Sequence, residues 1–148
     1  MSTSLSSDGN TIAIGNSKGS INGSWTGYVQ VYEYVSSSWT QVGLNLVGEA
    51  PSDESGWSVS LNKDGKFVAI GAPQNDGSGN KSGHVRIYQN ISGVWTKIGD
   101  DLNGGTSYNY FGWSVSLSEN GSIVAIGGYQ NNGNTESGHV RIYEYNGT

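Results

Sequence analysis

Residues 57–71 read WSVSLNKDGKFVAIG, and residues 113–127 repeat them closely as WSVSLSENGSIVAIG. Residues 1–15, MSTSLSSDGNTIAIG, form a more divergent copy at the same spacing of 56 residues. Internal repeats are weighed before any local pattern, because each copy of a repeat folds as one unit against its neighbours. The rest of the sequence is therefore divided according to this repeat.

The similarity continues past these stretches. At the same spacing Trp95 aligns with Trp39, and Gly99 aligns with Gly43. The third copy loses one residue in a loop, where length changes are best tolerated. We expect a single repeat domain over residues 1–148, with repeat 1 at 1–56, repeat 2 at 57–112 and an incomplete repeat 3 at 113–148.

Each complete copy holds four segments with the character of β-strands. In repeat 2 they are WSVSL, FVAIG, GHVRIYQ and VWTKIG. They are short, rich in β-branched and aromatic residues, and bounded by Gly, Asn, Asp or Ser. Asp64-Gly65 and its counterparts join the first two segments, and such pairs supply the positive φ angles of a tight turn. Each copy is predicted to be an antiparallel meander of four strands.

A meander of this kind becomes stable when copies pack against one another around an axis. Four strands in a period of about 40–50 residues are typical of a β-propeller blade. The period of 55 to 56 residues here is slightly longer because the second and fourth connectors are long. The small residues of WSVSL suit the innermost strand, where blades crowd together. The fold class is therefore predicted to be all-β, made of propeller blades. A β-solenoid is the alternative, although its coils are usually shorter.

The ordered series of FG, WSVSL, VAIGAP and SGHVRIY resembles the FG-GAP repeat of integrin-α-type β-propellers. Phe111-Gly112 matches the FG, and Gly71-Ala72-Pro73 matches the GAP. The resemblance implies a propeller and a role in adhesion or extracellular binding. Members of that group often hold calcium in an Asp-rich first turn. Here the first turns carry at most one acidic residue at the apex, too few oxygens for calcium, so that site is not carried over.

The number of repeats is too small for one chain to form a closed propeller. Residues 1–148 encode about two and two-thirds blades, with the fourth strand of repeat 3 missing, whereas natural propellers have roughly four to eight blades. Each end blade would then expose an apolar face, and such patches usually mark interfaces. We expect a half-propeller that a second copy completes as a homodimer with six blades, or through exchanged strands. A fragment of a longer propeller is the alternative.

The charge and composition exclude several kinds of partner. The net charge of −5 argues against nucleic acid and against anionic membrane surfaces. The chain has no cysteine for disulfides or thiolate chemistry, and no apolar run of about 18 residues to span a bilayer. The first residues do not look like a signal peptide. An extracellular location follows only from the family resemblance, and the compartment is otherwise open.

Two recurring groups of side chains could carry chemistry. His84 and Arg86, repeated as His139 and Arg141, point to one face of a strand and could bind an anion. Because repeat 1 has Tyr and Gln at these positions, a contact between blades is the better interpretation. The recurring Trp residues are likewise expected to pack between blades, although aromatic rings can stack on sugars. Trp25 stands apart, in a long connector without a counterpart.

The second and fourth connectors of a meander leave the blade at the same end. Polar and aromatic residues gather in them, and loops carried on a rigid scaffold are common binding sites. The predicted ligand-binding face consists of Asp53, Glu54, Asp76, Tyr108, Asn109, Tyr110 and Glu136. The other interpretation is that these are solvated loop residues.

These patterns favour a non-enzymatic binding, adhesion or structural module that assembles with itself. A carbohydrate-binding propeller is the alternative, with loop Tyr, Trp, Asn and Asp holding a glycan; a protein ligand is also open. A glycosidase is the least favoured hypothesis, because no catalytic motif occurs and a near-symmetric repeat leaves little room for one asymmetric site. No catalytic residue, metal ligand or cofactor is assigned.

Overall fold

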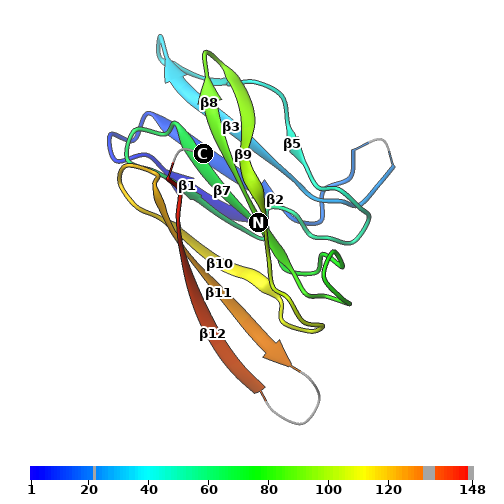
Figure 1. Ribbon diagram of the computed structural model, residues 1–148. Coiled ribbons are helices and arrows are strands. Elements are labelled where there is room, and N and C mark those ends of the chain that lie inside the picture. Colours follow the sequence, from blue (N-terminus) through cyan, green and yellow to red (C-terminus); the bar gives the residue numbers. More distant parts are fainter. Residues whose placement is uncertain (22, 132–135, 147–148) are drawn as a thin grey trace.

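The computed structural model describes residues 1–21, 23–131 and 136–146. Three antiparallel β-sheets follow one another along the chain and stand side by side (Figure 1). No helix occurs among the described residues, and so none long and apolar enough to cross a membrane. The all-β prediction is confirmed.

Each sheet corresponds to one repeat. The first contains β1 (Ser2–Leu5), β2 (Thr11–Asn16), β3 (Tyr28–Val35), β4 (Ser38–Gln41) and β5 (Leu46–Val47). The second contains β6 (Ser58–Leu61), β7 (Phe67–Ala72), β8 (His84–Ile91) and β9 (Val94–Asn103). The third contains β10 (Phe111–Leu117), β11 (Ile123–Asn131) and β12 (Glu136–Glu144).

Within each sheet the strands pair in chain order, as in the predicted meander. The outermost strand differs between blades. In the first blade it is broken into β4 and β5, which both pair with β3. In the second blade β9 runs unbroken along β8, with an irregularity between Val85 and Ile87. The described part of the third blade has three strands, with β12 at the edge.

The tight turn between the first two strands forms as its sequence predicts. Gly9, Gly65 and Gly121 have φ angles of 73°, 70° and 76°, which glycine adopts without steric cost. In the first copy Asp8 stabilises the turn by accepting hydrogen bonds from the Ser6 hydroxyl and the Asn10 backbone N–H. These side-chain bonds fix the hairpin and hold the two inner strands in register.

Apolar side chains fill the space between neighbouring blades. Between the first and second blades the buried core includes Val29, Val31, Val59 and Val68. Between the second and third blades it includes Val85, Phe111, Val124 and Ile126. Burial of these side chains is the main favourable term that holds one blade against the next.

Serine side chains tie the innermost strands to the following blade. The Ser58 hydroxyl donates to the carbonyl of Gly112 at 2.7 Å, and Ser60 Oγ accepts from the backbone N–H of Leu117 at 3.0 Å. The same two bonds join the preceding pair of blades, from Ser2 to Gly56 and from Leu61 to Ser4. The small residues of WSVSL therefore serve as connections between blades.

The glycine that ends each VAIG segment permits this close approach. A Cβ atom at Gly71 would overlap the carbonyl oxygen of Gly112, which accepts the bond from Ser58. The blades could not come this close with any larger residue at that position.

Both end blades expose apolar side chains whose counterparts are buried elsewhere. Leu61 is 7% exposed against the first blade, but the equivalent Leu5 is 57% exposed. Val85 is fully buried beneath the third blade, but the equivalent Val140 is 68% exposed. The two end faces therefore expose apolar residues at positions that are buried between neighbouring blades.

Candidate functional site

The second and fourth connectors lie together at one end of the blades, along the right and lower side of Figure 1. Backbone hydrogen bonds join them. The N–H of Ser55 donates to the carbonyl of Thr26 at 3.1 Å, and the N–H of Tyr110 donates to that of Lys81 at 3.0 Å. These loops form one continuous surface, which is called the connector end below.

Two residues of the predicted binding face are buried. The carboxylate of Asp53 accepts hydrogen bonds from Asn75 Nδ2 at 2.9 Å and from the N–H of Ala50 at 3.1 Å. Asp53 therefore holds the fourth connector of the first blade against the second blade. Asn109 occupies the equivalent position one blade later and is buried beside Thr106. Both side chains support the connectors from within.

The other predicted residues lie nearer the surface. Asp76 is exposed and accepts a bond from the N–H of Lys81, while Tyr108 is exposed and Tyr110 is half-buried. Glu54 is partly exposed, but its Oε2 atom is shielded from solvent and has no hydrogen-bond partner. Glu136 begins β12, and its side chain lies outside the described part of the chain.

The fourth connectors hold strained backbone at equivalent positions. Ser52 and Glu54 have φ angles of 72° and 57°, and Tyr108 and Tyr110 have φ angles of 58° and 47°. A left-handed conformation is uncommon for residues other than glycine, and it is a genuine outlier for bulky ones. Strain of this kind concentrates at functional sites, where the surrounding structure enforces it.

Tyr110, from the second of these connectors, joins a cluster of aromatic rings carried mainly by the neighbouring strands. The ring of Trp113 lies 4.7 Å from Trp57, 6.3 Å from Tyr110 and 5.9 Å from Tyr129, measured between centroids. Trp113 is 44% exposed and Tyr129 is also exposed. The repeat pattern marked Trp57 and Trp113, but it gave no sign that Tyr110 and Tyr129 would join them.

A separate pocket of about 210 Å³ opens beside Trp25. Lys18 and Glu54 line it with Ser17 and Ser52. The indole of Trp25, which is 64% exposed, gives this pocket an apolar wall, and the side chains of Lys18 and Glu54 add polar groups. The connector end thus offers both aromatic and polar contacts.

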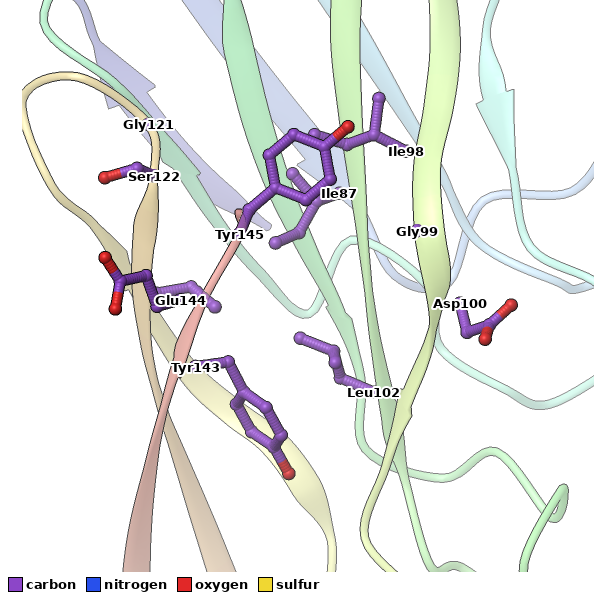
Figure 2. A pocket seen from close by; sticks show the side chains of 11 residues that line it. Ile87, Ile98, Gly99, Asp100, Leu102, Gly121, Ser122, Tyr143, Glu144 and Tyr145 are labelled. Carbon is purple, nitrogen blue, oxygen red and sulfur yellow. The ribbon is translucent and has the colours of Figure 1, made fainter. Parts of the chain in front are cut away.

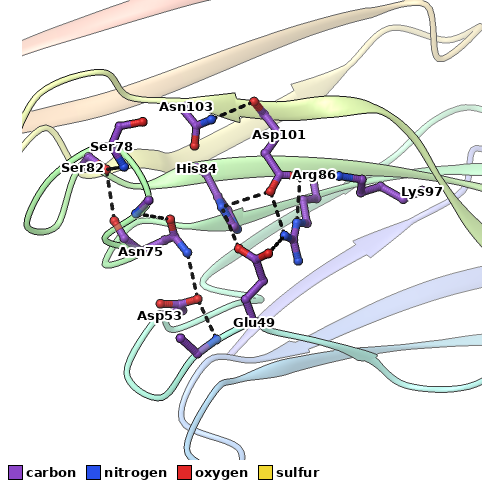
Figure 3. Close-up of polar contacts among 12 residues, drawn as sticks. Glu49, Asp53, Asn75, Ser78, Ser82, His84, Arg86, Lys97, Asp101 and Asn103 are labelled. Atoms are coloured by element: carbon purple, nitrogen blue, oxygen red, sulfur yellow. Dashed lines mark hydrogen bonds and ion pairs between the residues drawn. The ribbon is translucent and has the colours of Figure 1, made fainter.

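A network of charges lies on the second blade, next to the connector end (Figure 3). The guanidinium of Arg86 binds the Asp101 carboxylate through two bonds of 3.0 and 2.7 Å, and it also contacts Glu49. Lys97 Nζ donates to Asp101 at 2.7 Å. Because Glu49 comes from the fourth connector of the first blade, Arg86 joins two blades, as the sequence interpretation favoured.

His84 is buried beneath this network. Its Nδ1 atom lies 3.8 Å from Glu49 and 3.9 Å from Asp101, so these three residues resemble a set of metal ligands. The sequence gave no indication of these acidic neighbours. Burial, and then the charge of Arg86, lower the pKa of His84, whereas bonds from Arg86 hold the pKa of Asp101 well below 3.8. Because Arg86 already occupies both carboxylates, the network is best explained as a structural ion cluster.

The first blade repeats this arrangement without charge. Gln30 stands where Arg86 stands, and its side chain donates to Gln41 at 3.3 Å and to Asn45 at 3.1 Å. Gln41 and Asn45 correspond to Lys97 and Asp101. Hydrogen-bonded amides in the first blade therefore occupy the positions that charged side chains occupy in the second.

Comparison with models of protein families shows the family of this chain. A family model described as the FG-GAP repeat matches residues 46–88 and 102–143, which together make up more than half of the chain. The chain belongs to the FG-GAP repeat family. It is therefore a β-propeller module, and the resemblance seen in the sequence is confirmed. Each match starts in the outermost strand of one blade and ends in the third strand of the next.

No curated protein matches this FG-GAP chain. Among solved structures, it is similar to a Bacteroides uniformis protein provisionally assigned as a 6-phosphogluconolactonase. The TM-score is 0.49 at 13% sequence identity, over 97% of this chain. The chain spans 40% of the length of that protein.

Proposed function

We propose that this FG-GAP chain is a non-enzymatic binding or adhesion module that contacts its ligand at the connector end. The observation that supports this proposal best is the aromatic cluster in which the exposed rings of Trp113 and Tyr129 lie beside Tyr110 and Trp57. Rigid aromatic side chains supply large contact areas at little entropic cost, and they are enriched at binding surfaces.

The pairing of charges supports a binding role over a hydrolytic one. In the cluster that brings Glu49 and Asp101 together, Arg86 and Lys97 occupy the Asp101 carboxylate, and Arg86 also contacts Glu49. A glycosidase needs one carboxyl group held protonated and a second one free to act as a base or nucleophile. The ionic bonds around Asp101 favour its charged form and leave it no such freedom.

Carbohydrate is the second candidate ligand, and the aromatic cluster is the observation that favours it. Exposed Trp and Tyr rings bury large apolar surfaces and leave a polar group at the edge, which suits the mixed surface of a sugar. Tyr108 and the pocket beside Trp25 extend the aromatic and polar surface on the same end.

Binding to glycan and protein arrays tests these proposals. The wild-type chain should bind in a saturable manner, and Trp113→Ala should abolish the signal. Trp39→Ala is the matched control, because Trp39 is 46% exposed but lies away from the connector end. Binding on the protein array without binding on the glycan array would reject the carbohydrate ligand and support a protein ligand. Turnover of a chromogenic glycoside that disappears on replacing one carboxylate would refute the non-enzymatic role.

Self-assembly completes the proposed function. The exposed end faces, marked by Leu5 on the first blade and Val140 on the third, match the composition of the interfaces between blades. A second copy packed against both faces would close a ring of six blades by two-fold symmetry. Closure would also bring two connector ends to one rim, where a shared ligand would be held by both chains.

A further inference from the structure

The pocket beside Trp25 lies between the second and fourth connectors of the first blade, and its volume is about 210 Å³. Ser17, Lys18 and Trp25 come from the second connector, and Ser52 and Glu54 come from the fourth. The pocket is part of the connector end, so an inference about its ligand rests on the proposed function and makes that function more specific.

The backbone of Trp25 is fixed, although its side chain is exposed. Its carbonyl accepts a hydrogen bond from the Ser52 N–H at 2.8 Å, and the carbonyl of Thr26 accepts one from the Ser55 N–H at 3.1 Å. The indole itself is 64% exposed. A large apolar ring that is held by its backbone and left open to solvent is preorganised for a ligand.

Lys18 and Glu54 bring opposite charges to the same pocket. Neither side chain has an ion pair or a hydrogen bond with another residue in the described part of the chain, whereas Arg86 occupies the carboxylates of Glu49 and Asp101. A charged ligand would be attracted by one of the two free groups and repelled by the other. A neutral ligand with several hydroxyl groups accepts a bond from the ammonium group and donates one to the carboxylate, and such charge-assisted bonds are strong.

The groove between the second and third blades has a different chemistry (Figure 2). Ile87, Ile98 and Leu102 face Tyr143 across it, and no cationic side chain belongs to its described lining. The combination of an exposed ring, a cationic donor and an anionic acceptor therefore distinguishes the Trp25 pocket from this groove, and it favours a polar ligand with an apolar face.

Trp57 connects the pocket to the aromatic cluster of the third blade. Its backbone N–H donates to the carbonyl of Glu54 at 3.0 Å, and its ring lies 4.7 Å from that of Trp113. Trp113 in turn lies beside Tyr110. The pocket and the cluster are therefore neighbours on the connector end, and one long ligand is able to contact both.

The second blade also presents an aromatic ring where its connectors meet. In the repeat Ser52 aligns with Tyr108, and Trp25 aligns with Lys81. Tyr108 is 41% exposed. Each of the two blades thus combines one exposed ring with one lysine, which is Lys18 in the first and Lys81 in the second. A ligand made of repeated units would meet similar groups on both blades.

The size of the pocket limits the part of the ligand that enters it. Cavities that enclose a drug-sized molecule measure about 300–1,000 Å³. A pocket of about 210 Å³ holds a single ring, and the rest of a longer ligand lies on the neighbouring surface. A sugar ring whose hydroxyl groups are all equatorial has C–H groups on both faces, so one face stacks on an indole while the edge forms hydrogen bonds.

We propose that the connector end binds a neutral, extended chain of β-1,4-linked hexopyranose units, with one unit in the Trp25 pocket. The face of this unit stacks on the indole of Trp25. One of its hydroxyl groups accepts a bond from the Lys18 ammonium group, and another donates to the Glu54 carboxylate. The units that follow lie on Trp57 and Trp113.

Isothermal titration calorimetry with cellohexaose tests the proposal on the whole chain. The wild-type chain should bind cellohexaose in a saturable manner. Trp25→Ala should weaken this binding at least about tenfold, because it removes the stacking platform. The matched control is Trp39→Ala, which removes an exposed indole away from the connector end and should bind as the wild type does. Circular dichroism checks that both variants are folded.

Charged hexamers test the role of the two opposite charges. The β-1,4-linked hexamers of glucuronate and of glucosamine have the backbone of cellohexaose, and both are charged in weakly acidic buffer. Each should bind at least about fivefold more weakly than cellohexaose. Lys18→Gln introduces the residue that the second blade has at this position, Gln74, and should reduce the discrimination against the glucosamine hexamer. Glu54→Gln should do the same for the glucuronate hexamer.

Three results would overturn the proposal: no saturable binding of cellohexaose, equal binding by Trp25→Ala and the wild type, or tighter binding of a charged hexamer than of cellohexaose. A protein ligand that binds on the array and is lost with Trp113→Ala would leave the proposed function intact in each of these cases.

Discussion

Ser60 illustrates how a single small residue joins two blades, because its hydroxyl oxygen accepts a bond from the Leu117 N–H. Ser60→Ala leaves that backbone donor unpaired between the blades. The variant should lose about 1 kcal/mol of unfolding free energy in urea denaturation. Ser20→Ala, at an exposed loop position, should leave the unfolding free energy unchanged. Equal stabilities of the two variants would contradict a role for the serines between blades.

Asp101 makes stability depend on pH in acid. Bonds from Arg86 hold its pKa well below 3.8, so the unfolded chain takes up the proton first as the pH falls. The stability that Asp101 contributes is therefore complete above about pH 5 and is lost progressively below about pH 4. Asp101→Asn should flatten this acid limb of the unfolding free energy measured against pH.

His84 provides an internal control for that measurement. Burial lowers its pKa below 6.5, so the unfolded chain binds this proton first and stability falls as the pH drops below about 6.5. This earlier decline should persist in Asp101→Asn. Replacing the whole ionic set by the amides of the first blade, through Arg86→Gln, Lys97→Gln and Asp101→Asn, should give a folded protein without the later decline.

Contacts between blades could be predicted from the sequence only in part. The recurrence of Ser58 and Ser60 was visible in the repeat, but their partners lie in another copy and depend on how blades stack. Arg86 was correctly interpreted as a contact between blades. Its acidic partners were not predicted, because Glu49 and Asp101 approach it from separate strands and loops that only the folded structure brings together.

At the scale of single elements, the outermost strand of the second blade closes the interface with the first blade by a tryptophan. Trp95 is buried against the first blade and donates a hydrogen bond to it. Trp95→Ala should lower the unfolding free energy by about 3 kcal/mol, as expected for a large buried aromatic residue. Trp39→Ala, at the equivalent but exposed position, should cost well under half of that by calorimetry or denaturation. Similar losses would indicate that Trp95 does not close the interface.

The strands themselves were predictable, since alternation and turn residues repeat in each copy. The irregularities were not. The break between β4 and β5 and the unbroken course of β9 arise in segments with the same pattern of residues, so the pattern did not predict them. The meeting of the connectors at one end was predictable. The burial of Asp53 and Asn109 was not, because Asp53 bonds to Asn75 of another loop and Asn109 bonds to Thr106 of its own connector.

At the scale of the whole molecule, the outer faces of the first and third blades both expose apolar side chains. Leu5 and Val140 are exposed where Leu61 and Val85 are buried. In the proposed ring, the face with Leu5 in one copy packs against the face with Val140 in the other. Because each copy contributes both faces, the proposed contact has two-fold symmetry and closes with two copies.

The molar mass in solution, measured by light scattering across a dilution series, tests this account most directly. Ring closure by two copies predicts a two-chain mass that persists on dilution. A well-folded species of single-chain mass at every concentration would contradict it.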